Sequence, residues 1–505
     1  MAQSGNTKNK EDRKRLLSSR SLRKFVGSGD QPALVGIFAV LLLGFVFAVF
    51  EIFTTSSFSV DPPALAKERE RKRFAADVTT PMPEVPFSMP KIVEPSFPDR
   101  DCPITEFGAV PGGKVLNTES IRKAIASCEQ KGGGRVVVPK GLWLSGAIHL
   151  KSNINLHVEA GGKILFSNDL SEYLPPVFSR FEGIELMNYS PFIYARDATN
   201  IAITGDGELD GNGKMWQDWN KVQEPSLLRL EKLADQGAPL AERNFALAED
   251  ALQPSFVQFV RCRNILLEDI KISRSPSWTI HPVYSSDITV RHVEVYTDAR
   301  NTDGIAIDSS RNVVVHDSIF RAGDDAIVIK SGKDRDGLRV REASENIVIH
   351  DVTVEDGHGA IAFGSEMSGG IRNVFVKNLT ATRADFGIRF KSMRGRGGVI
   401  EDITIENMKM GRSVYEGIQV DMDYGTPLRP DDTSLSPIFR DITVRNLSID
   451  RARTGLRIVG LPESPVENLI LENISIQAEK DGVAPIHLKN EQFRNVNIIV
   501  QDRKK

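Results

Sequence analysis

The feature that most constrains this chain is a short repeat that runs from residue 200 almost to the C-terminus. Each copy starts with Asn or Asp and continues with alternating apolar and polar residues, which is the pattern of a half-buried strand. From Asn264 onward the copies are separated by roughly 23 to 39 residues, a period typical of solenoid proteins with loop insertions. They begin at Asn200, Asn264, Asp287, Asn312, Asn346, Asn373, Asp402, Asp441, Asn468 and Asn495.

Several short strands in each repeat, with almost no helical periodicity, predict an all-β chain that folds as a right-handed parallel β-helix. The Ile and Val side chains of each coil should face the interior, and the Asn or Asp at each turn can bond to nearby backbone. The Asn-x-Ser/Thr matches at Asn378, Asn446 and Asn473 fall inside the repeat, so we interpret them as turn residues rather than glycan acceptors. Residues 117–130 carry a helical apolar stripe and are expected to cap the first coil.

Four of the strand-like runs carry polar motifs at matching positions. The motifs are Asn301-Thr302-Asp303-Gly304, Gly323-Asp324-Asp325, Gly357-His358-Gly359 and Arg389-Phe390-Lys391. When each run is aligned on its first small residue, the Asp and His side chains lie one or two residues before that point, and the Arg and Lys lie after it. If the runs are neighbouring parallel strands, about 4.8 Å apart, three carboxylates, an imidazole and two cations gather at one edge of a sheet. Like charges at close range cost free energy, so the arrangement calls for a chemical explanation.

Glycosidic hydrolysis would supply that explanation. It requires a protonated carboxyl group at the leaving oxygen and a carboxylate that either activates water or attacks the sugar. The three aspartates of these motifs supply the candidates, and crowding should raise the pKa of at least one of them. His358 is placed to tune that group, while Arg389 and Lys391 suit a carboxylate on the substrate.

The ordered set of four motifs resembles the polygalacturonase family of pectin-cleaving glycoside hydrolases, over about residues 101 to 500. Three further stretches are similar to its larger bacterial or exo-acting members: Asp210-Gly211-Asn212-Gly213, Ser275-Pro276-Ser277-Trp278 and Gly364-Ser365-Glu366. The resemblance implies an inverting, exo-acting hydrolase of α-1,4-linked galacturonic acid in pectin-type polysaccharides or oligomers. It implies no cofactor and no metal.

The resemblance also implies a role for each site residue. Asp324 would be the general acid, while Asp303 and Asp325 would hold and activate the water. His358 would support protonation of the acid. Phe390 stands where the family has Ile, and by alternation it should point into the core. Substrate binding would fall to Arg389, Lys391, Tyr424 and Asn301.

The N-terminal hundred residues lie outside the repeat and divide into three segments. Residues 1–31 form a polar, basic tail, and residues 32–53 contain an apolar run of roughly 20 residues, which suits a membrane-spanning helix. The positive-inside rule keeps the basic tail cytoplasmic, so we expect a signal anchor with the remainder periplasmic or extracellular. Residues 54–100, charged and then proline-rich, are expected to be an extended tether. It would hold the catalytic domain, residues 101–505, off the membrane.

Three other features leave alternatives open. The N-terminal helix could belong to a cleaved leader, because Ala64-Leu65-Ala66 resembles a cleavage site. Of the three cysteines, Cys102 and Cys128 could pair if the fold brings them together, although unpaired thiols are the plainer interpretation. Residues 214–252 look partly helical, and they could form a wall of the cleft or a plain surface excursion.

Other functions fit parts of the same pattern. The net charge of −3 implies no nucleic-acid partner, and the number of subunits is left open. Rhamnogalacturonan or another uronide would suit the same residues. A β-helix polysaccharide lyase would instead need a calcium site and a basic residue as the base. A non-catalytic polysaccharide-binding β-helix would have no use for the complete set of aspartates and histidine.

Overall fold

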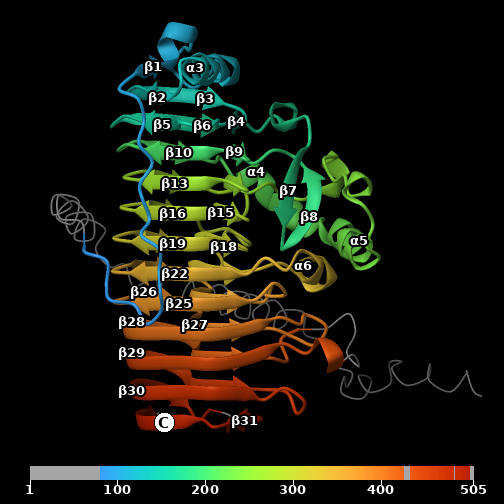
Figure 1. The fold of residues 1–505 in the computed structure, drawn as a ribbon, viewed down its shortest axis with the longest axis vertical. Coiled ribbons are helices and arrows are strands. Elements are labelled where there is room, and N and C mark those ends of the chain that lie inside the picture. The colour runs from blue at the N-terminus through green and yellow to red at the C-terminus, as the bar shows by residue number, and fades with distance from the viewer. Residues whose placement is uncertain (1–79, 426–432, 483, 501–505) are drawn as a thin grey trace, which may run out of the picture. The chain divides into compact units, whose positions relative to one another are not determined.

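The computed structural model describes residues 80–425, 433–482 and 484–500. Within them, thirty strands form one continuous sheet that coils into a parallel β-helix, as Figure 1 shows. The predicted all-β solenoid is therefore confirmed. The predicted membrane helix at 32–53 lies outside the described residues. No helix among those described is long and apolar enough to cross a membrane.

The coils stack into three columns of parallel strands. The first column contains β1 (Asp101–Pro103), β2 (Gly134–Val138), β5 (Ile154–Val158), β10 (Thr199–Thr204), β13 (Arg263–Glu268), β16 (Ser286–Arg291), β19 (Arg311–His316), β22 (Ser344–His350) and β25 (Ile371–Lys377). The second contains β3 (Gly141–Ser145), β6 (Gly162–Phe166), β11 (Glu208–Asp210), β14 (Lys271–Ser273), β17 (Glu294–Tyr296), β20 (Ile319–Arg321), β23 (Thr353–Asp356) and β26 (Thr380–Ala384). The third contains β4 (Ile148–His149), β9 (Ile193–Arg196), β12 (Val257–Val260), β15 (Ile280–Val283), β18 (Ile305–Asp308), β21 (Ile327–Lys330), β24 (Gly359–Gly364) and β27 (Phe386–Lys391).

The C-terminal coils are built from longer strands that bend through more than one column, and a few helices interrupt the solenoid. The strands are β28 (Val399–Asp421), β29 (Ile438–Val459), β30 (Val466–Lys480), β31 (Leu488–Lys489) and β32 (Gln492–Val500). The helices are α3 (Thr118–Gln130), α4 (Lys214–Gln217), α5 (Glu224–Asp235) and α6 (Asp334–Val340). The 3-10 turns are η1 (Ile104–Phe107), η2 (Leu170–Tyr173), η3 (Asp218–Lys221), η4 (Leu240–Glu242), η5 (Ala248–Asp250) and η6 (Thr433–Leu435).

The Asn residues of the repeat adopt a left-handed backbone conformation, most of them within a strand and Asn378 between β25 and β26. Asn378 and Asn446 adopt φ values of 55° and 57°, a left-handed conformation that Asn tolerates better than most residues. Their side chains also form a ladder along the solenoid. Asn407 Nδ2 donates to Asn378 Oδ1 at 3.2 Å, and Asn473 Nδ2 donates to Asn446 Oδ1 at 3.1 Å. The backbone conformation expected of turn residues is therefore confirmed at Asn378, Asn446 and Asn473, although only Asn378 lies between strands.

The predicted helix caps the first coil. Ile121 and Ile125 of α3 are buried against β1, β2 and β5. Asn117 stands at the N-cap, but its side chain bonds to the Val110 and Val115 backbone instead of capping the helix. Cys102 and Cys128 form a disulfide that joins β1 to α3. The interpretation of these two residues as free thiols was wrong, because only the folded cap brings them together.

Residues 80–100 lie along the outer face of the first column (Figure 1), and we call them the arm. Val85, Phe87 and Met89 alternate with polar or proline residues, so an extended backbone turns these three toward the coils. Val85, Phe87, Met89 and Ile92 pack against Val314, Val348 and Phe375. Thr80 Oγ1 donates to Asp317 Oδ1 at 2.8 Å. This stretch is extended, as expected for the tether, but it belongs to the same compact unit as the β-helix.

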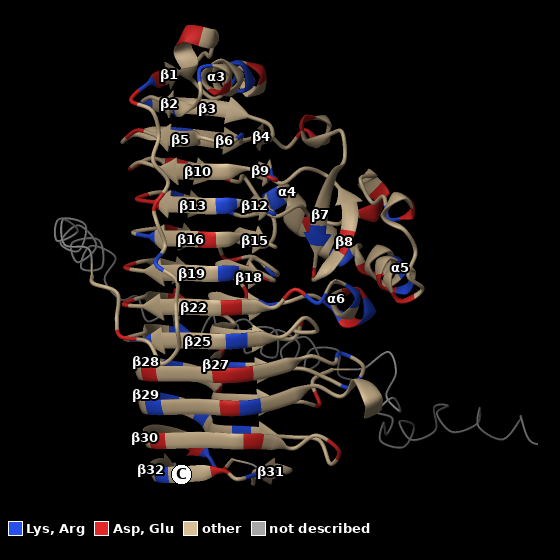
Figure 2. Ribbon diagram, viewed as in Figure 1, with Lys and Arg blue, Asp and Glu red and all other residues tan. Residues whose placement is uncertain are grey.

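A second feature that the sequence did not reveal is an antiparallel hairpin of β7 (Val177–Phe181) and β8 (Ile184–Asn188). It stands beside the third column together with α5 (Figure 1). Phe181, Ile184 and Leu186 of the hairpin pack against Leu230 of α5. The expected helical content of residues 214–252 is therefore confirmed, and this insertion supports the hairpin. Lys, Arg, Asp and Glu occur together along α5 and α6 (Figure 2).

Candidate active site

The predicted register of the motif-bearing strands is confirmed. Ile305 of β18 is opposite Ile327 of β21, and in the next two coils Ala362 of β24 is opposite Arg389 of β27. The turn before each strand keeps the same spacing, since Gly304 N donates to Asp325 O at 3.0 Å and His358 N donates to Asp324 O at 2.8 Å. Because the turns are stacked as regularly as the strands, motifs far apart in sequence become neighbours.

The inward side chains of these strands form the core. Phe390 is fully buried and stacks on Phe363, with ring centroids 4.4 Å apart. This confirms its predicted inward orientation. The outward side chains between them are small: Ala306, Val328 and Ala362 form a floor that is covered by Trp278.

A cavity of about 380 Å³ opens beside Trp278, which lines its wall. Six of the eight predicted site residues line it, and Asp325 and Arg389 lie behind its wall. The lining residues are Glu182, Trp278, Arg300, Asn301, Asp303, Gly323, Asp324, Lys330, His358, Ser365, Glu366, Lys391 and Tyr424.

The aspartates of the site differ in burial and in charge environment. Burial raises the pKa of the Asp303 carboxyl well above its ordinary value, and the neighbouring aspartates add to the effect while Lys330 opposes it. Burial also disfavours the charge on Asp325, but Lys391 and other nearby cations hold the pKa of Asp325 down at about 2. Lys391 Nζ donates to Asp325 Oδ2 at 2.7 Å. The raised pKa belongs to Asp303, and its main cause is burial rather than the expected crowding.

Asp324 and His358 form the accessible side of the group. Asp324 is half-buried, and its Oδ1 accepts a hydrogen bond of 2.9 Å from the backbone N–H of Asp325. His358 Nδ1 lies 3.0 Å from Asp385 Oδ2, so Asp385 fixes the imidazole and leaves Nε2 as the free ring nitrogen. Sequence reasoning missed Asp385. The alignment could have found it, because Asp385 precedes Gly387 by two residues, as His358 precedes Ala360.

The two predicted substrate-binding cations are placed differently. Arg389 is 3% exposed, donates from Nε to Gln419 Oε1 at 2.7 Å, and packs beneath the Phe386 ring at 4.1 Å. It also lies 5.2 Å from the Tyr424 ring centre. Arg389 thus supports the cavity wall, whereas Lys391 and Tyr424 reach the cavity itself.

Other charged residues at the cavity were not singled out as site residues from the sequence. Arg300 adjoins the Asn301 turn, and its backbone oxygen accepts from Asn220 of the insertion at 3.3 Å. Lys330 Nζ donates to Glu366 Oε2 at 2.7 Å. Glu182 comes from the tip of the hairpin, where it adopts φ 42°. Lys330 could have been found from its outward position at the end of β21. Nothing in the sequence marked Glu182, at the tip of the hairpin, as a residue of the cavity.

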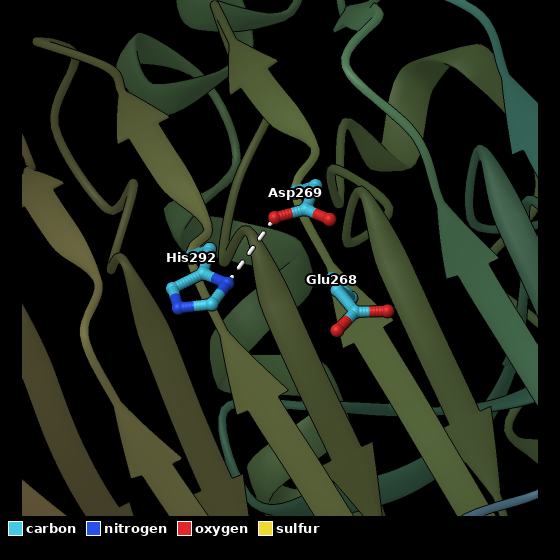
Figure 3. Close-up of side chains that lie close together, drawn as sticks. All are labelled: Glu268, Asp269 and His292. Atoms are coloured by element: carbon cyan, nitrogen blue, oxygen red, sulfur yellow. Dashed lines mark ion pairs between the residues drawn. The ribbon is translucent and has the colours of Figure 1, made fainter. Parts of the chain in front are cut away.

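A second group of ionisable side chains, Glu268, Asp269 and His292, lies at the edge of the first column (Figure 3). His292 Nδ1 lies 3.2 Å from Asp269 Oδ1, and this contact raises the pKa of His292. Arg291 pairs with Glu268 at 2.5 Å and also with Glu94 of the arm. These ion pairs explain the group as part of the attachment of the arm.

A parallel β-helix with carboxyl groups, an imidazole and cations around one surface cavity is the arrangement of a polysaccharide-cleaving glycoside hydrolase. Residues 240–496 match the model of glycosyl hydrolases family 28. The chain belongs to this family and is a polygalacturonase-like glycoside hydrolase.

Relatives of known name match the sequence of this protein along most of its length. A probable polygalacturonase of Vitis vinifera is 28% identical over 74% of this chain and 73% of its own length. An exo-poly-alpha-D-galacturonosidase of Dickeya chrysanthemi is 27% identical over 78% of this chain and 70% of its own. The crystal structure of an exopolygalacturonase from Thermotoga maritima is 37% identical, covers 81% of this chain and 94% of its own, and superposes with a TM-score of 0.76.

Proposed function

We propose that this protein hydrolyses α-1,4 linkages between galacturonic acid residues in pectin-type polysaccharides or oligomers, from the chain end and with inversion. The observation that carries this proposal is the charge composition of the cavity. Asp303 and Asp324 line it together with Lys391 and Arg300. Hydrolysis needs the carboxyl groups, and an anionic sugar needs the cations.

Arg300 is the cation best suited to bind the substrate. Its side chain is exposed, and it makes no ion pair within the described part of the chain. By contrast, Lys330 and Lys391 already contact Glu366 and Asp325. A uronate carboxylate would therefore meet Arg300 first, with Lys391 and Tyr424 on the other side of the cavity.

The roles of the aspartates follow from access. Asp324 is half-exposed and lies beside His358, so it can reach a leaving oxygen and serve as the general acid. Asp303 would be the base that activates water. Asp325 is fixed by Lys391 through Oδ2, while its Oδ1 accepts no hydrogen bond from the described residues. That oxygen would hold the same water.

Exo action is supported by the hairpin. Its tip residue Glu182 lines the cavity, and Arg180 beside it forms a buried ion pair of 2.9 Å with Asp308 of β18. Lys333 pairs with Glu231 of the insertion at 2.6 Å and also approaches Glu182. An element fixed in this way would obstruct one end of a long polymer and leave room for its terminus. Two of the relatives above are named as exo-acting enzymes.

We further propose that the enzyme is exported and anchored by residues 32–53, with its N-terminus cytoplasmic. The support is the apolar run and the basic tail before it. Protease added to cells whose outer membrane, where present, has been removed should degrade the catalytic domain but leave an N-terminal tag protected by the inner membrane. A domain that stays intact until the cells are broken would contradict this topology.

The function is tested by incubating the purified full-length chain with polygalacturonate and with a galacturonate trimer. Wild type and Asp324→Asn are compared by reducing-end release, product size and unsaturation. We expect saturated galacturonate monomer from wild type from the first minutes. The variant should be slower by roughly 10²- to 10⁴-fold. Unsaturated products would indicate a lyase, mixed oligomers would indicate endo action, and full activity of Asp324→Asn would exclude its role as the acid.

A further inference from the structure

Lys330 and Glu366 form a buried ion pair at the cavity, outside the four motifs that define the site. Lys330 Nζ lies 2.7 Å from Glu366 Oε2 and 3.7 Å from Asp303 Oδ2. It also sits 4.2 Å above the centre of the Trp278 ring. The exposed fractions are 4% for Lys330 and 8% for Glu366. One cation therefore lies between two carboxylates in a place where water screens their charges weakly.

We infer that Lys330 and Glu366 are positioning residues that set the ionisation of Asp303. Lys330 favours the charged form of this carboxyl, and Glu366 limits that effect by sharing the same cation. The inference rests on the proposed function, in which Asp303 must be ionised to activate water. Its physical basis is that an opposite charge within about 4–6 Å lowers the pKa of a carboxyl, while a like charge raises it.

The geometry explains why such a pair is useful. Asp303 is 2% exposed and closely surrounded by carboxyl groups, which disfavours its charge. Lys330 is the main cation that opposes this tendency. If Lys330 were unpaired, it would hold Asp303 strongly ionised and would be free to bind the substrate itself. The bond to Glu366 fixes the ammonium group and weakens its field at Asp303.

Other charged groups face the same residues, and they stay in place when either member of the pair is changed. Those facing Asp303 are Asp324 and Asp325, from the turn before β21, and Lys391, from the end of β27. Those facing the pair are Arg396, Lys333, Glu182, Asp308, His281, Asp325 and Asp334. Because these groups are present in both single variants, a comparison of the two variants measures the effect of Lys330 and Glu366 on Asp303.

The test is the dependence of kcat/KM on pH for Lys330→Gln and Glu366→Gln in the full-length chain. The acidic limb of this profile reports the pKa of the essential base. Removal of the cation makes Asp303 harder to ionise, so the limb of Lys330→Gln should move to higher pH by roughly 1 to 3 units. Removal of Glu366 takes away the nearest carboxylate of Lys330, so Lys330 acts more strongly on Asp303 and that limb should move to lower pH by roughly 1 unit.

Shifts of the acidic limb in opposite directions for the two variants distinguish an electrostatic effect on Asp303 from structural damage. If both limbs move the same way, or neither moves while the rates fall, the inference is overturned. Opposite shifts of the alkaline limb would uphold the pair and make Asp303 the acid. The matched controls are Lys163→Gln and Glu208→Gln, because Lys163 lies 2.9 Å from Glu208 and 3.3 Å from Asp210, far from the cavity. Neither control should shift the profile.

Asp303→Asn separates this inference from the proposed function. If Asp303→Asn keeps wild-type activity, the proposed base is wrong. If it is inactive and the limbs of Lys330→Gln and Glu366→Gln stay where they are, the catalytic role of Asp303 is upheld and only the role of the pair fails.

Discussion

Two outward rows of side chains, one on the first column and one on the third, show how a single repeat can serve two purposes. In both, the inward Ile, Val and Phe residues pack into the same core. On the third column the outward row is Ala306, Val328 and Ala362, two alanines and one valine that pack under Trp278 at the wall of the cavity. On the first column the outward row is Val314, Val348 and Phe375, which are larger and are covered by the arm.

The difference shows that the repeat determines the coil, while the outward residues determine what each face does. Small residues under Trp278 allow charged side chains from neighbouring turns to surround a substrate. Larger apolar residues at the equivalent place would expose hydrophobic surface, and the arm removes that surface from water. The predictions below test this division of roles.

The largest effect is expected where the floor under Trp278 is filled. Ala362→Leu adds bulk beneath Trp278 at a fully buried position, so neighbouring side chains must shift. We expect kcat/KM on polygalacturonate to fall roughly 100-fold and the free energy of unfolding to fall by about 1–3 kcal/mol. The matched control, Val348→Leu, lies on the arm-covered row. It should cost similar stability and leave kcat/KM unchanged. Equal losses of activity in both variants would break the comparison.

A smaller effect is expected from the exposed cation of the cavity. Arg300→Gln removes a charged donor for a uronate carboxylate, an interaction worth about 1.5–3 kcal/mol. KM for polygalacturonate should rise roughly 10- to 100-fold, while a methyl-esterified substrate should be affected much less. Arg311→Gln, on the exposed start of β19, serves as the control. An unchanged KM in Arg300→Gln would show that the carboxylate binds elsewhere.

The smallest effect is expected from the arm. Phe87→Ala removes apolar contact with the first column, so the free energy of unfolding should fall by about 1–2 kcal/mol with no change in kcat/KM. Denaturant unfolding and a rate assay on the same sample measure both quantities. Lys91→Ala, on an exposed position of the arm, should change neither. A loss of activity in Phe87→Ala would link the arm to the cavity and contradict the separation of the two faces.

Much of the site was accessible from the sequence because the solenoid is regular. Once Gly304, Ala326, Ala360 and Gly387 are aligned, stacking of parallel strands places the aspartates, His358 and Lys391 together, and the structure keeps this register. The fold itself followed from the alternation of residues and from the Asn turns. Both are local properties that every coil repeats.

Elements outside the repeat could only be located by the tertiary structure. The hairpin that brings Glu182 to the cavity, the arm, and the disulfide of Cys102 and Cys128 each depend on contacts between distant segments. The position of Arg389 behind the wall was decided in the same way, by Gln419 and Phe386. The sequence alone determined the coil and the order of its motifs, because a repeating local pattern dictates its own stacking. Only the tertiary structure decided which charges pair. Pairing depends on side chains from different segments, and their positions do not follow from the sequence repeat.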